Sequence, residues 1–141
     1  MNAHASRHLR AWLLLVAALA IHVADEAMTG FLAVYNPLVL RIRASVPWFF
    51  APTFTFEIWL GGLILLVCVL AALGPAVRRG AFGTRLASWA LAAIMFLNGL
   101  GHLSASLYVW RWLPGTTSAP LLIALSILLA HRTRERRTAA E

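Results

Sequence analysis

Four long apolar stretches constrain the fold of this chain more than any other feature of its sequence. They cover residues 11–35, 54–73, 86–109 and 117–130. A helix that crosses a bilayer needs about 20 mostly apolar residues, and the shortest stretch reaches across if its ends snorkel or the bilayer thins. The pattern predicts an all-α membrane protein in which residues 1–141 form one bundle of four transmembrane helices.

The composition excludes a soluble domain. Hydrophobic residues make up 61% of the chain and charged residues only 12%, whereas soluble domains carry about 25% charged residues. The single cysteine, Cys68, lies in the second apolar stretch. It has no partner for an intramolecular disulfide, and we expect it to be a small buried apolar side chain.

Turn signals separate the apolar stretches. Asn36-Pro37 is expected to end the first span and Gly74-Pro75 the second, while Leu113-Pro114-Gly115 separates the third from the fourth. A cleavable signal peptide is an alternative for the start of the chain. It is disfavoured because apolar character resumes after Glu26.

The arginines give the bundle an orientation. All twelve basic residues are arginine, and with four crossings nine of them fall on one side and three on the other. The nine are Arg7, Arg10, Arg78, Arg79, Arg85, Arg132, Arg134, Arg136 and Arg137, and the three are Arg41, Arg43 and Arg111. The positive-inside rule then predicts cytoplasmic termini, with residues 132–141 as a basic cytoplasmic tail.

The net charge of +7 raises the question of nucleic-acid binding. The arginines flank apolar stretches instead of lining one helical face, so no nucleic-acid partner is expected. The expected partner is the lipid bilayer, and three histidines that flank the spans, His4, His8 and His131, are expected to face solvent or headgroups.

Ionisable residues inside the apolar stretches are the most informative feature for function. A charge at the centre of a span costs about 2.5–3.5 kcal/mol on insertion scales, so such residues are usually partnered and functional. His22, Asp25 and Glu26 lie at i, i+3 and i+4 on one helical face, and Asn98 and His102 share a face of the third span. Depth along the helices places these groups at the midplane or in the outer half of the bilayer, which predicts one polar site.

Three interpretations of this site stay open. His22, Asp25, Glu26 and His102 have the donor types that bind a divalent metal such as zinc, iron or manganese, with Asn98 orienting a ligand from behind. Glu57, near the outer end of the second span, and Glu26 are the candidate catalytic carboxyls. The same groups suit a metal-free acid–base or proton-relay site, or hydrogen bonds that only hold the helices together.

These segments resemble the HXXEE domain family of bacterial and archaeal membrane proteins. The resemblance is carried by His22-Val23-Ala24-Asp25-Glu26, by Asn98 to His102, and by Trp112 to Thr117 with its Pro114-Gly115 turn. Asp25 replaces the first glutamate of the family pattern, and Trp112 replaces a tyrosine. The resemblance implies a functional His/carboxylate site in a multi-pass protein of the bacterial inner (plasma) membrane, and it names no substrate.

Two activities and one non-enzymatic role are therefore expected. The first is a metal-dependent membrane enzyme, hydrolytic or redox, that acts on a lipid-like or amphipathic small molecule. The second is a small proton-coupled transporter or channel, which would need a homo-oligomer because one copy has few helices. The third is a structural or partner-binding membrane subunit.

Overall fold

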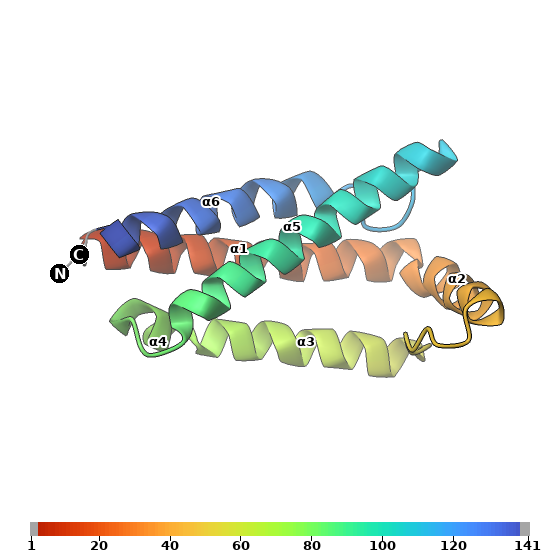
Figure 1. Ribbon diagram of the computed structural model, residues 1–141, viewed down its shortest axis with the longest axis horizontal. Helices are drawn as coiled ribbons and strands as arrows, with labels where there is room; N and C mark the ends of the chain where they lie inside the picture. The colour runs from red at the N-terminus through yellow and green to blue at the C-terminus, as the bar shows by residue number, and fades with distance from the viewer. Residues whose placement is uncertain (1–2, 139–141) are drawn as a thin grey trace.

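The computed structural model describes residues 3–138, and this part of the chain is helical with no strand (Figure 1). Its helices are α1 (Ala3–Thr29), α2 (Phe31–Ser45), α3 (Phe56–Ala72), α4 (Gly74–Arg79), α5 (Thr84–Val109) and α6 (Ala119–Thr138). The predicted all-α class is confirmed. The predicted tail at 132–141 continues α6 as far as Thr138, and residues 139–141 lie outside the described part.

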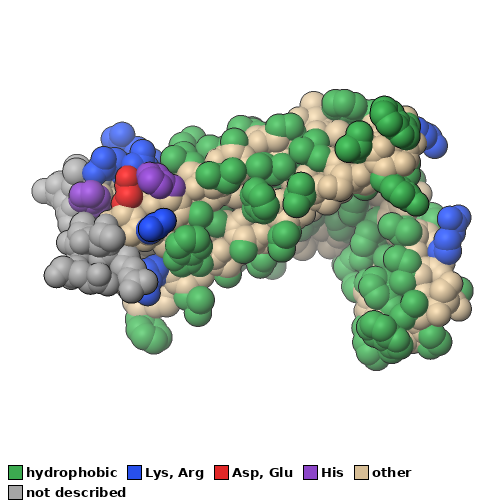
Figure 2. Space-filling view, turned by 45° about the horizontal axis from the view of Figure 1, so that its top comes forward, with side chains coloured by type: hydrophobic (Ala, Val, Ile, Leu, Met, Phe, Trp, Pro, Cys, Tyr) green, Lys and Arg blue, Asp and Glu red, His purple; other side chains and the backbone are tan. Residues whose placement is uncertain are grey.

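Three helical segments of the described chain are long and apolar enough to cross a membrane: His4–Thr29, Phe56–Arg79 and Thr84–Val109. The second of them combines α3 and α4. Large apolar side chains on these helices, such as Ile64 and Leu65, point outward. In Figure 2 apolar side chains cover the surface between two charged ends, as expected for contact with lipid. The fourth predicted crossing falls in α6, whose apolar part is shorter.

The first predicted span is interrupted earlier than its sequence suggests. α1 contains no glycine or proline and ends at Thr29, because Gly30 takes a left-handed conformation with φ of 80°. Pro37 lies inside α2 and does not end a helix, so the expectation for Asn36-Pro37 is wrong. α2 turns away from the axis of α1 (Figure 1), and the Asn36 side chain hydrogen-bonds both backbone groups of Phe54, at 2.9 and 3.1 Å.

Gly74-Pro75 does not reverse the chain either. Pro75 lies in the first turn of α4, where no backbone N–H is needed, so the helical path continues to Arg79. The reversal comes at Gly80 and Gly83, which have φ of 71° and 80°. The turn predicted at Leu113-Pro114-Gly115 does separate α5 from α6, as expected.

α1 is the central helix, with α6 packed along it and α3 and α4 on another side (Figure 1). Trp12 and Leu15 of α1 are fully buried, and the Trp12 indole donates a 2.9 Å hydrogen bond to the carbonyl of Leu70 in α3. α5 and α6 meet closely at Gly99, where an added Cβ would lie 2.9 Å from the carbonyl oxygen of Ala119. Cys68 is exposed on α3, which contradicts its expected burial, because this face of α3 packs against no other described helix.

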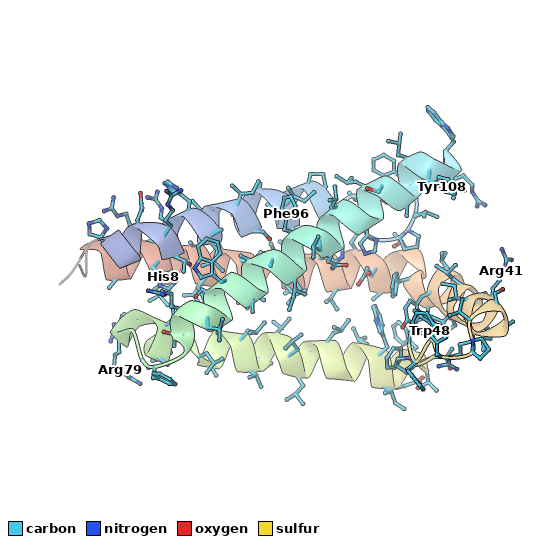
Figure 3. The ribbon with its side chains drawn as sticks, in the orientation of Figure 1. His8, Arg41, Trp48, Arg79, Phe96 and Tyr108 are labelled. Carbon is cyan, nitrogen blue, oxygen red and sulfur yellow. The ribbon has the colours of Figure 1, made fainter. Side chains whose placement is uncertain are left out.

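The start of α1, the end of α6 and the turn after α4 lie at the same end of the molecule (Figure 1). Figure 3 shows Arg79 at this end and Arg41 and Trp48 at the opposite end. Most of the polar residues that the sequence singles out inside the spans lie in the second halves of α1 and α5, away from the arginine-rich end, and Glu57 lies in the first turn of α3.

Candidate metal site

The first two members of the site come from one face of α1. His22 and Glu26 are one helical turn apart and are 0% and 5% exposed. The Nε2 atom of His22 lies 3.7 Å from the Oε1 atom of Glu26. The i, i+4 spacing brings these two side chains together, as the sequence predicts.

His102 of α5 completes the group. Its Nε2 atom lies 3.1 Å from the same Glu26 Oε1 atom, and its ring meets that of His22 edge to face, with centroids 4.8 Å apart. One ligand atom from each of the three residues lies within 4.8 Å of the others, so the triad of His22, Glu26 and His102 can hold a metal ion. We refer to these three residues as the triad.

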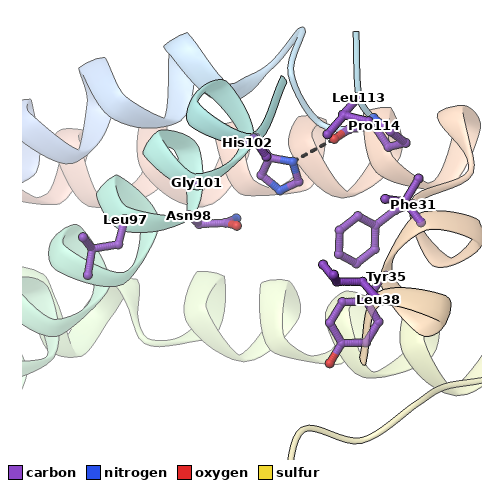
Figure 4. A pocket seen from close by; sticks show the side chains of 11 residues that line it. Phe31, Tyr35, Leu38, Leu97, Asn98, Gly101, His102, Leu113 and Pro114 are labelled. Atoms are coloured by element: carbon purple, nitrogen blue, oxygen red, sulfur yellow. Dashed lines mark hydrogen bonds between the residues drawn. The ribbon is translucent and has the colours of Figure 1, made fainter. Parts of the chain in front are cut away.

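The loop between α5 and α6 positions both imidazoles. The Pro114 carbonyl accepts a 2.7 Å hydrogen bond from Nδ1 of His102 (Figure 4). Gly115, with φ of 81°, lies against both rings: an added Cβ would be 2.7 Å from Nδ1 of His102 and 3.0 Å from Cε1 of His22. Only glycine combines this backbone conformation with this close approach.

Two further side chains hold the loop in place. The Ser106 hydroxyl on α5 accepts a 3.1 Å hydrogen bond from the backbone N–H of Leu113 and also bonds the Thr116 hydroxyl at 2.5 Å. Ser106 and Thr116 are both buried. The loop is therefore anchored on the helix that carries His102.

The hydrogen-bond network assigns the tautomers of both histidines. A carbonyl only accepts, so Nδ1 of His102 carries the proton shared with Pro114. Nδ1 of His22 lies 2.8 Å from the Ser118 hydroxyl. That hydroxyl directs its single proton to Asp25 at 2.7 Å, so it accepts from His22. Both rings therefore carry a proton on Nδ1, and in the neutral form of each ring the Nε2 lone pair faces Glu26.

Three acceptors therefore converge on one buried point. With both rings neutral, two Nε2 lone pairs and a carboxylate oxygen repel one another unless a metal ion or a proton lies between them. Nε2 of His22 is buried with no hydrogen-bond partner. A buried polar group without a partner needs an explanation, and a cation bound within the triad supplies one.

The donor set and spacing suit a transition metal. Ligands at about 2.0–2.2 Å in tetrahedral geometry lie about 3.4 Å apart. The two spacings between an imidazole Nε2 and Glu26 Oε1, 3.1 and 3.7 Å, bracket that value, and all three ligand atoms lie within 4.8 Å of one another. Two histidines and one glutamate also leave a fourth position open, which is the arrangement of catalytic zinc sites.

A cavity of about 310 Å³ adjoins the triad at His102 (Figure 4). It lies between α2 and α5, and its walls are mostly apolar. Phe31 and Tyr35 of α2 form one wall, and Leu97 and Asn98 of α5 form the other. The volume falls at the lower end of the range for small-molecule sites.

The structure places the predicted site residues in three different settings. His22, Glu26 and His102 come together in the triad. Asp25 instead accepts hydrogen bonds from Ser118, and Asn98 lines the cavity. Glu57 lies exposed in the first turn of α3, outside the triad.

The sequence interpretation missed the residues behind the triad. The Pro114 carbonyl and the Ser118 hydroxyl fix the two rings, and Ser106 and Thr116 anchor the loop. A backbone carbonyl leaves no sequence signal. The run of hydroxyl residues around the Pro114-Gly115 turn is the sequence signal that could have drawn attention to this loop.

A second buried polar group lies at the arginine-rich end. His8, expected to face solvent or headgroups, is 1% exposed, so that expectation is wrong. Its Nε2 atom lies 3.0 Å from the Ser88 hydroxyl of α5 and 3.3 Å from the Thr133 hydroxyl of α6. These bonds join three helices, and they arise because α6 continues beyond its apolar part and covers His8.

Comparisons with family models, curated proteins and solved structures found no match for this chain. The resemblance to the HXXEE domain family therefore stays a prediction from the sequence.

Proposed function

We propose that the triad binds a divalent metal ion and that the protein is a metal-dependent membrane enzyme. The observation that carries the proposal is the convergence of two Nε2 lone pairs and the Glu26 carboxylate on one buried point, with both Nδ1 protons already used. Zinc, iron and manganese all suit this donor set. A bound metal ion polarises a substrate carbonyl or lowers the pKa of a bound water.

The metal itself is the first thing to test. Purified protein is analysed for zinc, iron and manganese beside His22→Ala and His102→Ala, with His131→Ala as the control because His131 lies in the exposed tail of α6. About one metal per chain, lost in the first two variants and kept in the control, supports the proposal. Background metal in a folded parent protein that also fails to take up added zinc, iron or manganese contradicts it.

The proposed substrate is lipid-like or amphipathic. The cavity beside His102 is lined mainly by apolar side chains that suit a hydrocarbon chain, with Asn98 available to hydrogen-bond a polar linkage near the triad. Glu57 is the sequence-based candidate for a general acid or base at the mouth, while Glu26 binds the metal. Ala105→Trp fills the cavity, so it should abolish turnover of an acyl-ester probe while metal content stays unchanged. Loss of metal in this variant would show that filling the cavity disturbs the triad, and this would contradict a substrate cavity separate from the metal ligands.

A proton-coupled transporter is the second candidate. It is supported by the 3.1 Å contact between His102 Nε2 and Glu26, which a shared proton satisfies as well as a metal does. Proton flux into liposomes that disappears in Glu26→Gln, together with metal-free parent protein, favours the transporter. If neither metal nor flux is found, the third candidate, a structural subunit of the bacterial plasma membrane, is favoured.

We also propose four crossings with cytoplasmic termini. Support comes from the grouping of the α1 start, the α4 turn and the α6 end at one end of the molecule (Figure 1), where most arginines lie. Single cysteines at Tyr108 and Arg134, in a Cys68→Ser background, report the two ends of the α5–α6 pair. An impermeant thiol reagent should reach only position 108 from outside the cell. Labelling of both positions from the same side contradicts a fourth crossing.

A further inference from the structure

Asp25 does not join the triad, although its type and position predict a metal ligand. Its Oδ2 atom accepts hydrogen bonds from the Ser118 backbone N–H at 3.0 Å and from the Ser118 hydroxyl at 2.7 Å. Ser118 immediately precedes α6. The carboxylate therefore lies at a helix N-terminus, where negative charge is stabilised, and it joins α1 to α6.

Ser118 in turn contacts His22. The hydroxyl has one proton, and its two other neighbours, Asp25 Oδ2 and the Gly115 carbonyl at 3.3 Å, only accept. The hydroxyl oxygen is therefore left to accept from Nδ1 of His22 at 2.8 Å. Asp25 acts on the imidazole through Ser118, without touching it.

We propose that Asp25 and Ser118 are positioning residues that hold the Nδ1 proton of His22 and so leave its Nε2 atom bare for a metal ion. This inference rests on the proposed metal site. Without the Ser118 hydroxyl, the buried ring can place its proton on Nε2, where Glu26 accepts it and the metal position is blocked. Groups behind metal ligands of this kind usually change metal affinity by about 10–100-fold.

The experiment measures zinc affinity in Ser118→Ala and in Ser118→Thr, which restores the hydroxyl. Ser126→Ala is the matched control, because Ser126 is also a buried serine, lies within α6, and has a hydroxyl with no hydrogen-bond partner in the described structure. Ser118→Ala should bind zinc about 10–100-fold more weakly than the parent, and Ser118→Thr should recover most of the loss. Ser126→Ala should bind zinc like the parent.

A second readout separates positioning from direct ligation by Asp25. With cobalt in place of zinc, the visible spectrum of Asp25→Ala should keep the intensity and number of bands of the parent, because no ligand is lost. A changed coordination spectrum in Asp25→Ala, together with parental zinc affinity in Ser118→Ala, would overturn the proposal and make Asp25 a ligand.

Failure of the metal site and failure of this inference are distinguishable. If the parent binds neither zinc nor cobalt, the proposed function fails, and nitrogen NMR of the metal-free protein decides the positioning role. A proton on Nδ1 of His22 in the parent supports it, and a bare Nδ1 overturns it. If the parent binds zinc and Ser118→Ala binds it equally well, only the positioning role fails.

Discussion

Gly115→Ala should disrupt metal binding although residue 115 contributes no ligand. The added Cβ would lie 2.7 Å from both Nδ1 and Cε1 of His102 and 3.0 Å from Cε1 of His22, and real Cβ atoms essentially never come closer than 3.0 Å. The His102 ring must therefore move by about 0.3 Å, which exceeds the tolerance of about 0.2 Å for metal–ligand distances. The move also strains the hydrogen bond to Pro114.

The expected loss is about 10–100-fold in zinc affinity, or about 1.4–2.8 kcal/mol. A left-handed backbone conformation at a non-glycine residue also lowers the free energy of unfolding by about 1–2 kcal/mol. A control variant is needed to separate this loss of stability from the loss of zinc affinity. Gly83→Ala introduces alanine at nearly the same φ, 80°, with no atom within 4 Å of its Cβ. Zinc titration and thermal unfolding are measured on both variants.

Both variants should lose stability, and only Gly115→Ala should lose zinc affinity. Parental zinc affinity in Gly115→Ala would refute the close contact between this loop and the two rings. An equal loss of zinc affinity in Gly83→Ala would show that general destabilisation, and not ring displacement, is responsible.

Three other predictions concern separate parts of the structure. Glu26→Gln should abolish zinc binding because it removes the charged ligand, while Glu57→Gln, outside the triad, should keep parental zinc affinity in the same titration; equal binding by both would exclude Glu26 as a ligand. His8→Ala should destabilise the protein by about 2 kcal/mol through a lost three-helix contact. It should leave zinc affinity unchanged, because His8 lies about 21 Å along α1 from His22. Trp12→Phe should lower the free energy of unfolding by about 1 kcal/mol in a denaturant titration, because it removes the hydrogen bond to the Leu70 carbonyl. An unchanged free energy of unfolding would argue against that contact.

The apolar pattern correctly predicted that the chain is helical and where its long apolar helices lie, because apolar character and helix formation both depend on local sequence. It misjudged helix ends. Gly30 stops α1 before Pro37 is reached, and Pro75 is accommodated in a first turn. Glycine at positive φ and proline at a helix start are local effects, but which of several turn signals ends a helix depends on what the chain packs against afterwards.

The triad itself was predictable. His22 and Glu26 are one helical turn apart, and His102 is an ionisable residue expected at a similar depth in the bilayer. The contacts behind it were not, since Pro114 acts through its backbone and Ser118 belongs to a loop without periodicity. The burial of His8 depends on α6 extending past its apolar part, which hydrophobicity alone does not show.

The different roles of Asp25 and Glu26 follow from helical geometry. Each residue turns the helix by about 100°, so relative to His22 position i+3 lies about 60° to one side and position i+4 about 40° to the other. α1 has α6 and α5 as neighbours in this region, and the two acids point to different ones. Glu26 reaches His102 of α5, while the shorter Asp25 reaches the backbone N–H of Ser118 at the start of α6. A shared helical face brings both acids to the site. The sign of the angular offset decides which acid faces the proposed metal position and which one is hydrogen-bonded to Ser118 behind His22.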